Sequence, residues 1–279
     1  MMNYKFSVSI CVYNGDNAKH FDTAMQSVFE QTLPPDEVVL VVDGPVNAEI
    51  NKTIEKYKSQ YNKILKVIYA PKNMGHGNAR RLGMKNCTND LIAIMDADDI
   101  CEPSRFEKQI NVFKSYDCVS VVGGLIKEFV GDTANVVGVR NVPEFDGNIK
   151  RYMQKRCPVN QVTAMLNIKD VEAAGGYIDW YCEEDYYLWL RMALQNKKFY
   201  NIQENLVYVR VGDEMYRRRG GIKYFKSEAK LQRYMLDNKI INISRYIINV
   251  SERFVIQVLM PNRLRGWVFK KLARNKENV

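Results

Sequence analysis

The stretch LIAIMDADDI, residues 91–100, joins a run of apolar residues to three aspartates. The five apolar residues at 91–95 are typical of a strand that is buried on both faces of a sheet. Asp96, Asp98 and Asp99 follow at once, and close carboxylates repel one another by roughly 4 kcal/mol per pair at about 4 Å and an effective dielectric of about 20. The pattern therefore predicts a positive partner at the end of this strand.

The chain before this stretch alternates between strand and helix patterns. The predicted strands are residues 5–13, 36–44, 64–70 and 91–96, and the predicted helices between them are residues 17–32, 47–61 and 77–87. Wholly apolar strands separated by helices indicate a parallel sheet covered on both faces. Ligands of such sheets bind beyond the carboxyl ends of the strands. This rule places the expected site at Tyr13, Asn14, Asp43, residues 73–80 and residues 96–99.

From residue 118 onward the pattern becomes mixed. We expect strands at residues 118–131, 136–143, 161–168 and 205–212 and a helix within residues 180–196. Because no linker rich in Pro or Ser separates the two parts, we interpret residues 1–215 as one α/β domain with a mostly parallel central sheet. Its halves are about 1–117 and 118–215.

The last segment, residues 216–279, is predicted to be helical and basic. From residue 241 onward, Lys and Arg alternate with large apolar residues, and only Glu252 and Glu277 are acidic. An amphipathic helix of this composition is typical of contact with an anionic membrane surface. The alternative is a helix that packs its apolar side on the preceding domain, and the sequence leaves both open.

Composition narrows the class of protein. With 46% hydrophobic and 26% charged residues, the 279-residue chain resembles ordinary globular proteins. No apolar run is long enough to predict a membrane-spanning helix, and no signal peptide is recognised, so we expect a cytoplasmic protein. Six scattered Cys and two His argue against a zinc site or disulfides. The net charge of +9 suggests an anionic partner: a nucleotide diphosphate, a nucleic acid or a membrane surface.

Asp96 and Asp98 are candidate metal ligands. Mg²⁺ and Mn²⁺ prefer oxygen ligands, and Mg²⁺ is often held by one or two carboxylates together with substrate phosphates. In an extended segment these two side chains point to the same side. The alternative is that the acids stabilise the start of the helix expected after Pro103. Glu102 lies closer to that start, so the sequence favours a site for a cation and a diphosphate.

The chain resembles the inverting family 2 glycosyltransferases of the Rossmann-like GT-A fold over most of residues 5–211. The segments that carry the resemblance stand in the family's order: SVSICVYNG, QSVFEQTLPPDEVVLVVDG, NMGHGNARRLGM, LIAIMDADD, GGY and EEDYYLWLR. It implies transfer of a sugar from a nucleoside-diphosphate donor, expected to be a UDP-sugar, with Mg²⁺ or Mn²⁺. The most similar members assemble bacterial capsule, exopolysaccharide or lipopolysaccharide, so a glycan or lipid-linked acceptor is expected.

The resemblance also implies roles for residues of the first half, which corresponds to the nucleotide-sugar half of the family. Asp98 matches the direct metal ligand, and Asp96 matches the acid that lies nearer the ribose or phosphate. Asp43 matches the acid that holds the base or ribose, although Asp before Gly is also typical of a turn. The remaining implied donor-binding residues are Val12, Tyr13, Asn14 and Arg80; Arg81 replaces the family's Asn.

In the second, acceptor half, the resemblance singles out Glu184 and Asp185. Inversion in one displacement needs a base for the acceptor proton, and Asp185 matches that base, with Glu184 as its catalytic neighbour. Acids in a first helical turn also stabilise the helix dipole, which is the alternative. Trp180 and Tyr181 could stack on an acceptor sugar or lie in the core. Candidate stabilisers of the leaving diphosphate are Arg210 and residues 217–219.

Two other functions compete with this one. GHGNAR, residues 75–80, nearly matches the dinucleotide fingerprint of an NAD(P)-dependent Rossmann oxidoreductase. However, Arg80 stands where that fingerprint needs a glycine for close helix packing, and three acids exceed what one ribose requires. The net charge of +9 suggests a nucleic-acid-binding protein. Its acidic strand ends argue against that function, so no nucleic acid is expected as a partner.

Overall fold

The protein is described by a computed structural model that covers residues 4–212 and 220–261. In chain order its elements are β1 (Phe6–Val12), α1 (Ala18–Phe29), β2 (Glu37–Val42), α2 (Ala48–Gln60), β3 (Leu65–Tyr69), α3 (His76–Asn86), β4 (Leu91–Asp96), β5 (Ile100–Cys101), α4 (Arg105–Ser115), β6 (Val119–Phe129), β7 (Val136–Arg140), α5 (Asp146–Met153), the 3-10 turn η1 (Gln161–Thr163), β8 (Met165–Asn167), α6 (Ile168–Ala173), α7 (Glu184–Leu194), β9 (Lys198–Arg210), α9 (Ile222–Asp237), α10 (Ile243–Phe254) and the π-helical turn η2 (Val255–Leu259).

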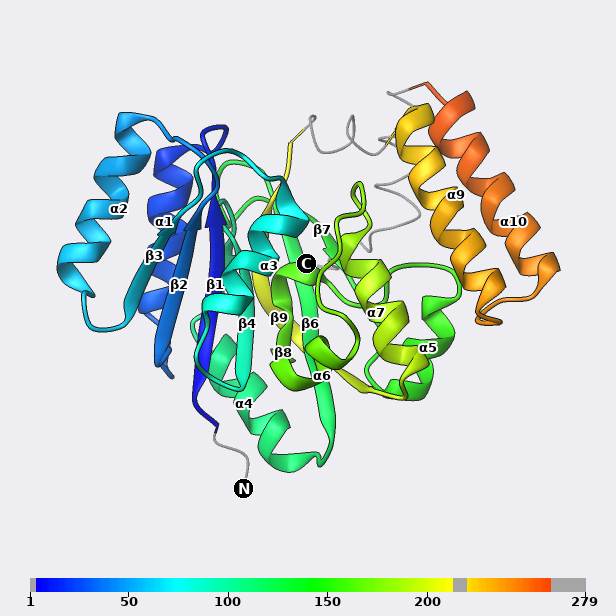
Figure 1. Cartoon of the computed structure of the whole chain (residues 1–279), viewed down its shortest axis with the longest axis horizontal. Coiled ribbons are helices and arrows are strands. Elements are labelled where there is room, and N and C mark those ends of the chain that lie inside the picture. The colour runs from blue at the N-terminus through cyan, green and yellow to red at the C-terminus, as the bar shows by residue number, and fades with distance from the viewer. Residues whose placement is uncertain (1–3, 213–219, 262–279) are drawn as a thin grey trace.

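The described strands form one sheet in the order β3-β2-β1-β4-β8-β6-β9-β5, and β7 pairs with β6. β3, β2, β1 and β4 are parallel, β8 runs antiparallel to both β4 and β6, and β9 is parallel to β6. The parallel first half and the mixed second half confirm the predicted fold. Because the carboxyl ends of β1, β2 and β4 lie at one edge, the loops that follow them share the upper rim of Figure 1.

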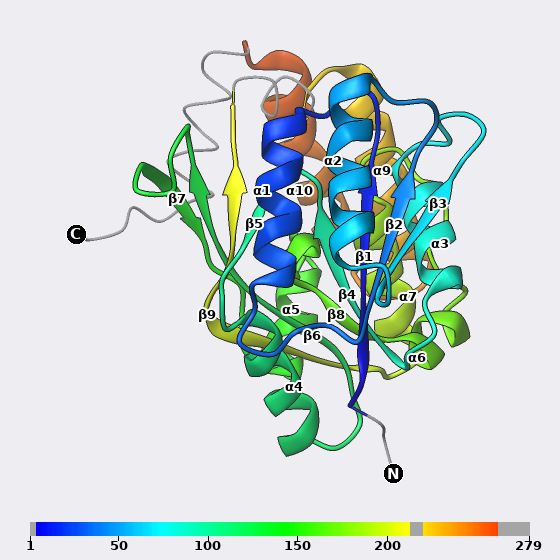
Figure 2. The ribbon, with the colours of Figure 1, turned by 90° about the vertical axis from the view of Figure 1, so that its left-hand side faces the viewer.

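Helices cover both faces of the sheet, as Figures 1 and 2 show. β4 illustrates why its sequence is wholly apolar. Leu91, Ala93 and Met95 belong to the core shared with α1, α2 and α4, whereas Ile92 and Ile94 belong to the core shared with α3, α7 and α9. Since successive strand side chains point to opposite faces, a strand covered on both sides needs apolar residues at every position.

α3 packs closely on β1, and this close packing determines where the Arg80 side chain can extend. A Cβ atom on Gly83 would collide with the Ser9 hydroxyl and lie 3.3 Å from Val41. Gly83 therefore allows the close packing of helix on strand that the dinucleotide fingerprint would require of a glycine at position 80. Arg80 lies one turn earlier, so its long side chain extends toward the rim instead of against the strand.

The second half departs from the predicted strands in detail. The segment predicted as a strand at residues 161–168 divides into η1, β8 and the start of α6. The Asn167 side chain accepts the Lys169 backbone N–H and caps α6, so local capping ends the strand early. β9 begins at Lys198, seven residues before the predicted strand, and α5 had not been predicted.

The C-terminal segment is helical where it is described, in α9 and α10, as predicted. Leu231 and Met235 of α9 lie in the same core as Leu188 and Leu190 of α7, so α9 packs on the domain. Residues 216–219 and 262–279 of the predicted tail lie outside the described residues. No helix in the described part combines the length and apolarity needed to span a bilayer. All six cysteines are free thiols, as expected.

Candidate active site

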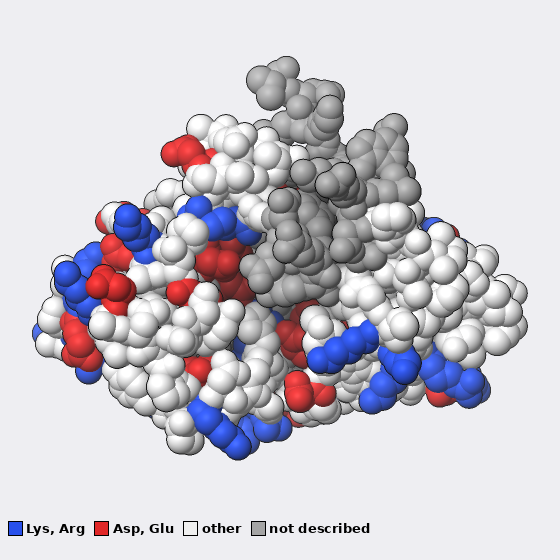
Figure 3. Space-filling view, turned by 90° about the horizontal axis from the view of Figure 1, so that it is seen from above, with Lys and Arg blue, Asp and Glu red and all other residues white. Residues whose placement is uncertain are grey.

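Acidic side chains gather where the parallel strands end. In the sheet register Val12 lies beside Val42, the residue before Asp43, and Cys11 lies beside Asp96, so three strand ends meet at one rim. Figure 3 shows acidic residues in a hollow at the middle of this upper face. Val12 is buried, whereas Tyr13 and Asn14 after it are exposed.

Asp16 belongs to this rim, although the sequence analysis did not select it. Its Oδ2 accepts the backbone N–H of Tyr13 over 2.9 Å and closes the turn after β1. Burial raises the pKa of Asp16 to about 6; the Tyr13 hydrogen bond opposes this shift and the Asp98 charge adds to it. The signal was available, because Asp16 follows the end of the predicted strand at residue 13 by only three residues.

Asp43 is 5% exposed and its Oδ1 accepts the backbone N–H of Met74 over 2.8 Å. Gly44 follows with a φ of +87°, and a Cβ there would lie 2.6 Å from the Asn73 nitrogen. The Asp-Gly pair thus forms a tight turn that holds the loop before α3. The implied contact of Asp43 with a base or ribose stays a prediction.

The three aspartates after β4 have different surroundings. β4 ends at Asp96 and residues 97–98 form a turn, so the expectation that strand alternation aligns Asp96 with Asp98 is wrong. Asp98 is exposed. Asp99 is 3% exposed and accepts the Arg210 backbone N–H over 2.8 Å, while Arg210 Nε donates to the Asp98 carbonyl over 3.2 Å. Burial, together with the charges of Asp98 and Asp96, raises the pKa of Asp99 well above its usual range.

The rim fits a hard divalent cation. Within residues 4–212 and 220–261, no three His, Cys, Asp or Glu side chains are grouped closely enough to hold an ion alone. The candidate ligands Asp96 and Asp98 offer only oxygen, and their charges add to the burial that raises the pKa values of Asp16 and Asp99. Mg²⁺ commonly completes such a set with phosphates and water.

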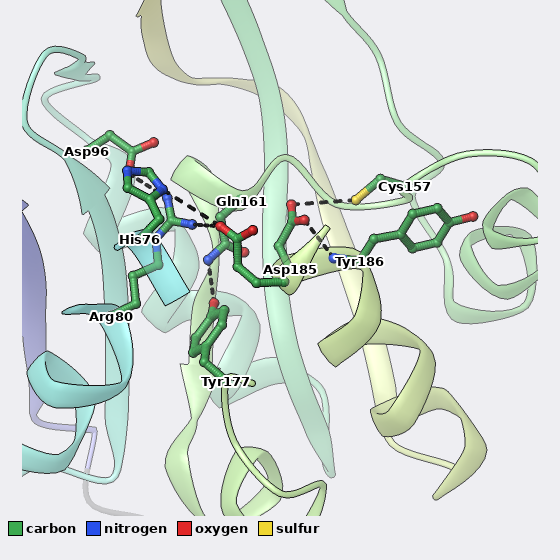
Figure 4. Close-up of polar contacts among 9 residues, drawn as sticks. His76, Arg80, Asp96, Cys157, Gln161, Tyr177, Asp185 and Tyr186 are labelled. Carbon is green, nitrogen blue, oxygen red and sulfur yellow. Dashed lines mark hydrogen bonds and ion pairs between the residues drawn. The ribbon is translucent and has the colours of Figure 1, made fainter. Parts of the chain in front are cut away.

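Arg80 is a positive partner for this strand end. Its Nη2 lies 2.8 Å from Asp96 Oδ1 and its Nη1 lies 2.8 Å from Glu184 Oε1. Figure 4 shows the Arg80 side chain extending from α3 toward Asp96. Arg80 is only 6% exposed. Burial opposes ionisation of Asp96 and Glu184. The Arg80 charge nevertheless lowers the pKa of Asp96, and a hydrogen bond with His76, followed by the Arg80 charge, lowers the pKa of Glu184. Arg80 therefore bridges the two acidic groups, and its implied donor contact stays a prediction.

Glu184 and Asp185 begin α7 and point to different neighbours. Whereas Glu184 pairs with Arg80, Asp185 Oδ1 accepts the Tyr186 N–H over 2.6 Å, and its Oδ2 lies 3.8 Å from Cys157 Sγ (Figure 4). Asp185 is partly buried. Burial, with the Glu184 charge next, raises the pKa of Asp185 to about 6. A carboxylate with this pKa is ionised at neutral pH and is a stronger base than an ordinary Asp.

The two aromatic residues before this acidic pair are held by α9. The Trp180 ring lies 4.5 Å from that of Tyr187, and its Nε1 donates to the Ser227 carbonyl over 3.3 Å. The core alternative therefore describes Trp180 better. Tyr181 is 43% exposed, its carbonyl accepts from Ser227 Oγ over 2.6 Å, and Lys223 Nζ lies 4.0 Å from the centroid of its ring.

Glu183 extends this contact to both C-terminal helices. It is 5% exposed, and burial raises its pKa well above the usual range. The Glu228 charge from α9 adds to the shift, and Arg253 from α10 opposes it. Glu228 and Arg253 lie 3.3 Å apart. The C-terminal helices thus adjoin the segment that carries Asp185.

Comparison with known proteins gives a consistent result. Residues 7–173 match the family described as Glycosyl transferase family 2. The chain is 33% identical over 97% of both chains to the Escherichia coli UDP-Gal:alpha-D-GlcNAc-diphosphoundecaprenol beta-1,3-galactosyltransferase. It is 32% identical to the amylovoran biosynthesis glycosyltransferase AmsE of Erwinia amylovora, over 95% of this chain and 98% of AmsE.

Solved structures support the fold. S. aureus TarS 1–349 with UDP-GlcNAc matches with a TM-score of 0.64 and 18% identity, over 90% of this chain and 72% of that one. The mannosyltransferase PcManGT from Pyrobaculum calidifontis, in complex with GDP-Man and Mn²⁺, matches with a TM-score of 0.62 and 13% identity, over 94% and 71%. These structures establish the GT-A fold, and neither alternative function finds support. The chain belongs to glycosyl transferase family 2 and is a glycosyltransferase.

Proposed function

We propose that this enzyme transfers a hexosyl group from a UDP-sugar to a hydroxyl of a lipid-linked or glycan acceptor, with inversion, during assembly of a bacterial surface polysaccharide. The E. coli relative is named for UDP-Gal and a diphosphoundecaprenol-linked acceptor, and AmsE is named for amylovoran biosynthesis. A match over nearly the whole of both relatives supports the same class of donor and acceptor here.

One observation carries this proposal: a single buried guanidinium joins the two acidic groups. Asp96, at the expected donor site, and Glu184, beside the proposed base, each lie 2.8 Å from Arg80. A transfer reaction needs the donor site and the acceptor base held in a fixed relation, because small displacements of reacting groups cost large factors in rate. The bridge meets this requirement with two charge-assisted hydrogen bonds.

Asp185 is the proposed base. The acceptor hydroxyl oxygen attacks the anomeric carbon, the bond from that carbon to the donor phosphate oxygen breaks, and the hydroxyl proton moves to the Asp185 carboxylate. A pKa of about 6 leaves this carboxylate ionised at neutral pH and able to accept that proton. Glu184, held by Arg80, keeps the first turn of α7 oriented, so its role is to position the base.

The donor site is proposed at the rim of the parallel strands. Asp98 and Asp96 would hold Mg²⁺ or Mn²⁺, which when bound neutralises charge on the diphosphate. Asp43 is proposed to contact the base or ribose, together with the backbone of residues 12–14. Accordingly, residues 1–117 are proposed as the nucleotide-sugar half and 118–215 as the acceptor half, with 216–279 as a C-terminal segment. We place the enzyme on the cytoplasmic side of the membrane, peripherally bound.

The test is a transfer assay with purified full-length chain, Mn²⁺ and a panel of nucleotide sugars. The acceptor is a synthetic GlcNAc diphospholipid, and UDP release and product configuration are measured by coupled assay and NMR. We expect UDP-hexose turnover that chelation abolishes and a product of inverted configuration. Retention of the donor configuration, or turnover that EDTA leaves unchanged, would contradict the mechanism.

A further inference from the structure

α10 packs on the rest of the molecule through polar side chains. Asn249 is 1% exposed and donates to the Gln154 carbonyl over 2.9 Å and to Gln232 Oε1 over 2.8 Å. Arg253 on the same side donates to the Lys155 carbonyl over 2.9 Å. Buried polar groups need such partners, and the Asn249 amide nitrogen has two. The apolar residues of α10 must therefore lie elsewhere.

Those apolar residues are exposed. Ile243 is 58%, Ile247 56% and Phe254 41% exposed, and their spacing of four and seven residues puts them on one side of the helix. We define the outer face of α10, continued into η2, as Ile243, Ile247, Ile248, Phe254, Val255 and Leu259. Figure 1 shows α10 at the outer edge of the molecule, with α9 between it and α7.

This arrangement reverses the usual one. A surface helix normally turns its apolar side to the core and its polar side to water, because burial of apolar area stabilises the fold. α10 buries Asn249 and exposes Ile243 and Ile247. Contiguous exposed apolar area of this kind marks an interaction surface. The outer face therefore needs an occupant.

A cationic groove adjoins the first turns of this face. It is an open groove of about 690 Å³ between Gln154, the end of α9 and the start of α10, and Ile240 and Ile248 are among its apolar residues. Lys239 and Arg245 also line it, and neither has an acidic partner within the described residues. The groove thus combines apolar walls with positive charge and suits an anionic amphiphile.

The net charge of the chain points the same way. The whole protein carries +9, and the sequence after the outer face contributes six basic residues against the single acid Glu277. Those basic residues are Arg263, Arg265, Lys270, Lys271, Arg274 and Lys276. An anionic bilayer attracts such a segment by about 1 kcal/mol per basic residue near its surface. A second copy would bring the same positive groove and be repelled.

We propose that the outer face of α10 docks on a bilayer that contains anionic phospholipid. Ile243 and Ile247 lie at the acyl boundary, and a lipid phosphate binds in the groove between Lys239 and Arg245. Helices on membrane surfaces combine a buried apolar side with flanking cations in this way. The sequence pattern had left membrane contact and packing on the domain as alternatives. In this proposal α9 packs on the domain. α10 packs on the rest of the protein through its polar side and contacts the membrane through its apolar side.

Vesicle co-sedimentation of the full-length protein tests the surface. The vesicles contain phosphatidylglycerol and phosphatidylethanolamine, with phosphatidylcholine vesicles for comparison. We expect wild type to bind the anionic vesicles. I243Q/I247Q should bind them at least about tenfold more weakly, because two apolar side chains are no longer transferred from water to the bilayer. K239Q/R245Q should also bind more weakly and show a shallower salt dependence than wild type.

Val130 and Val137 provide the matched control, because they are 45% and 41% exposed on the β6–β7 side. V130Q/V137Q should bind vesicles like wild type. Vesicle binding by I243Q/I247Q equal to that of wild type would overturn the proposal. The proposal would also be overturned if wild type were a dimer and this variant a monomer with unchanged vesicle binding. If the double variant does not fold, I247W replaces it and adds a fluorescent tryptophan to the outer face. Brominated lipid should quench the fluorescence of I247W more strongly than that of V137W. Equal quenching of the two variants would overturn the proposal.

The result can be separated from the proposed transferase activity. The outer face contains none of the residues proposed to bind donor or acceptor. I243Q/I247Q should therefore release UDP at the wild-type rate with a water-soluble acceptor. Normal vesicle binding by a protein that transfers no sugar would reject the proposed function alone, whereas normal transfer without the expected loss of binding would reject the docking surface alone.

Discussion

Arg80 Nη1 donates to Glu184 Oε1 over 2.8 Å, although the two residues are 104 positions apart in the chain. This contact joins α3 of the first half to α7 of the second, and the same guanidinium also holds Asp96 of β4. One side chain therefore couples the proposed donor site to the segment that carries the proposed base. Its removal should affect stability and chemistry together.

Substitution of Arg80 by Met should lower the free energy of unfolding by about 3–5 kcal/mol, because it leaves two partly buried carboxylates without their partner. The same change should reduce kcat by about a hundredfold or more, since Glu184 and the first turn of α7 lose their anchor. Urea denaturation and steady-state kinetics measure the two effects. R80K should fall between the wild type and R80M, because an ammonium cannot span both acids as a planar guanidinium does.

Arg81 is the matched control for this experiment. It is the next residue in α3, is exposed, and within residues 4–212 and 220–261 it donates to Asn78 Oδ1 over 3.1 Å and to no acidic side chain. R81Q should change stability by less than about 0.5 kcal/mol and leave kcat near that of the wild type. An R80M enzyme that matches R81Q in both measurements would show that the bridge has no such role.

Asp185→Asn should abolish transfer and yet stabilise the protein at pH 8. The folded-state pKa of about 6 lies above the ordinary 3.8, so the folded state favours the protonated acid. That favourable contribution is complete below about pH 4 and is lost as the pH rises through 6. Asn avoids the loss, so D185N should gain about 1–2 kcal/mol at pH 8 and little at pH 4, as measured by thermal melts. A less stable variant at pH 8 would contradict this account of the environment.

The activity of the wild type should depend on the same ionisation. With Asp185 as base, kcat should fall about tenfold for each pH unit below about 6, because the protonated acid cannot accept the acceptor proton. Asp16 also has a pKa of about 6, so the kcat profile of D16N serves as the control. D16N should change donor binding and keep the acid limb of kcat. Loss of that limb in D16N would assign it to Asp16.

The sequence predicted the parts of the fold that periodicity controls. β4 alternates between two apolar cores, so its run of apolar residues correctly indicated a strand covered on both faces. The short elements of the second half were harder to predict, because local chemistry decides them. Asn167, the last residue of β8, caps α6 near the end of the segment predicted as a strand at residues 161–168, and one side-chain hydrogen bond carries no periodic signal.

In the candidate site, too, general rules predicted some features, and others depended on contacts that the sequence does not reveal. The rule for parallel sheets brought Asp43 and Asp96 to one rim without knowledge of the structure. It could not show that Arg80 turns inward to pair with Glu184, because that contact depends on the path of the chain over 104 residues. The aspartate at 16 was missed for a simpler reason: it lies just beyond SVSICVYNG, the segment that carries the family resemblance and ends at Gly15.

Asp43 should separate folding from ligand binding. D43A leaves the partly buried Met74 N–H without its acceptor and should cost about 1–3 kcal/mol of stability. D43N keeps an oxygen for that N–H, so its stability should stay close to wild type, while its affinity for UDP falls because the carboxylate is gone. Urea melts and calorimetric titration with UDP measure the pair. Wild-type affinity in D43N would leave Asp43 with only its role in the turn.

Asp98→Asn should abolish transfer and weaken Mn²⁺-dependent UDP binding, because Asn keeps the shape of the side chain but not the charge that a hard cation selects. Removal of one charge should also relieve Asp16 and Asp99, lowering both pKa values and stabilising the protein slightly near pH 6. Asp90→Asn is the control, since Asp90 pairs only with the exposed Lys169. Titration of UDP with and without Mn²⁺ separates the outcomes. If D98N gained as much affinity from Mn²⁺ as D90N does, the cation would have to bind elsewhere on the rim.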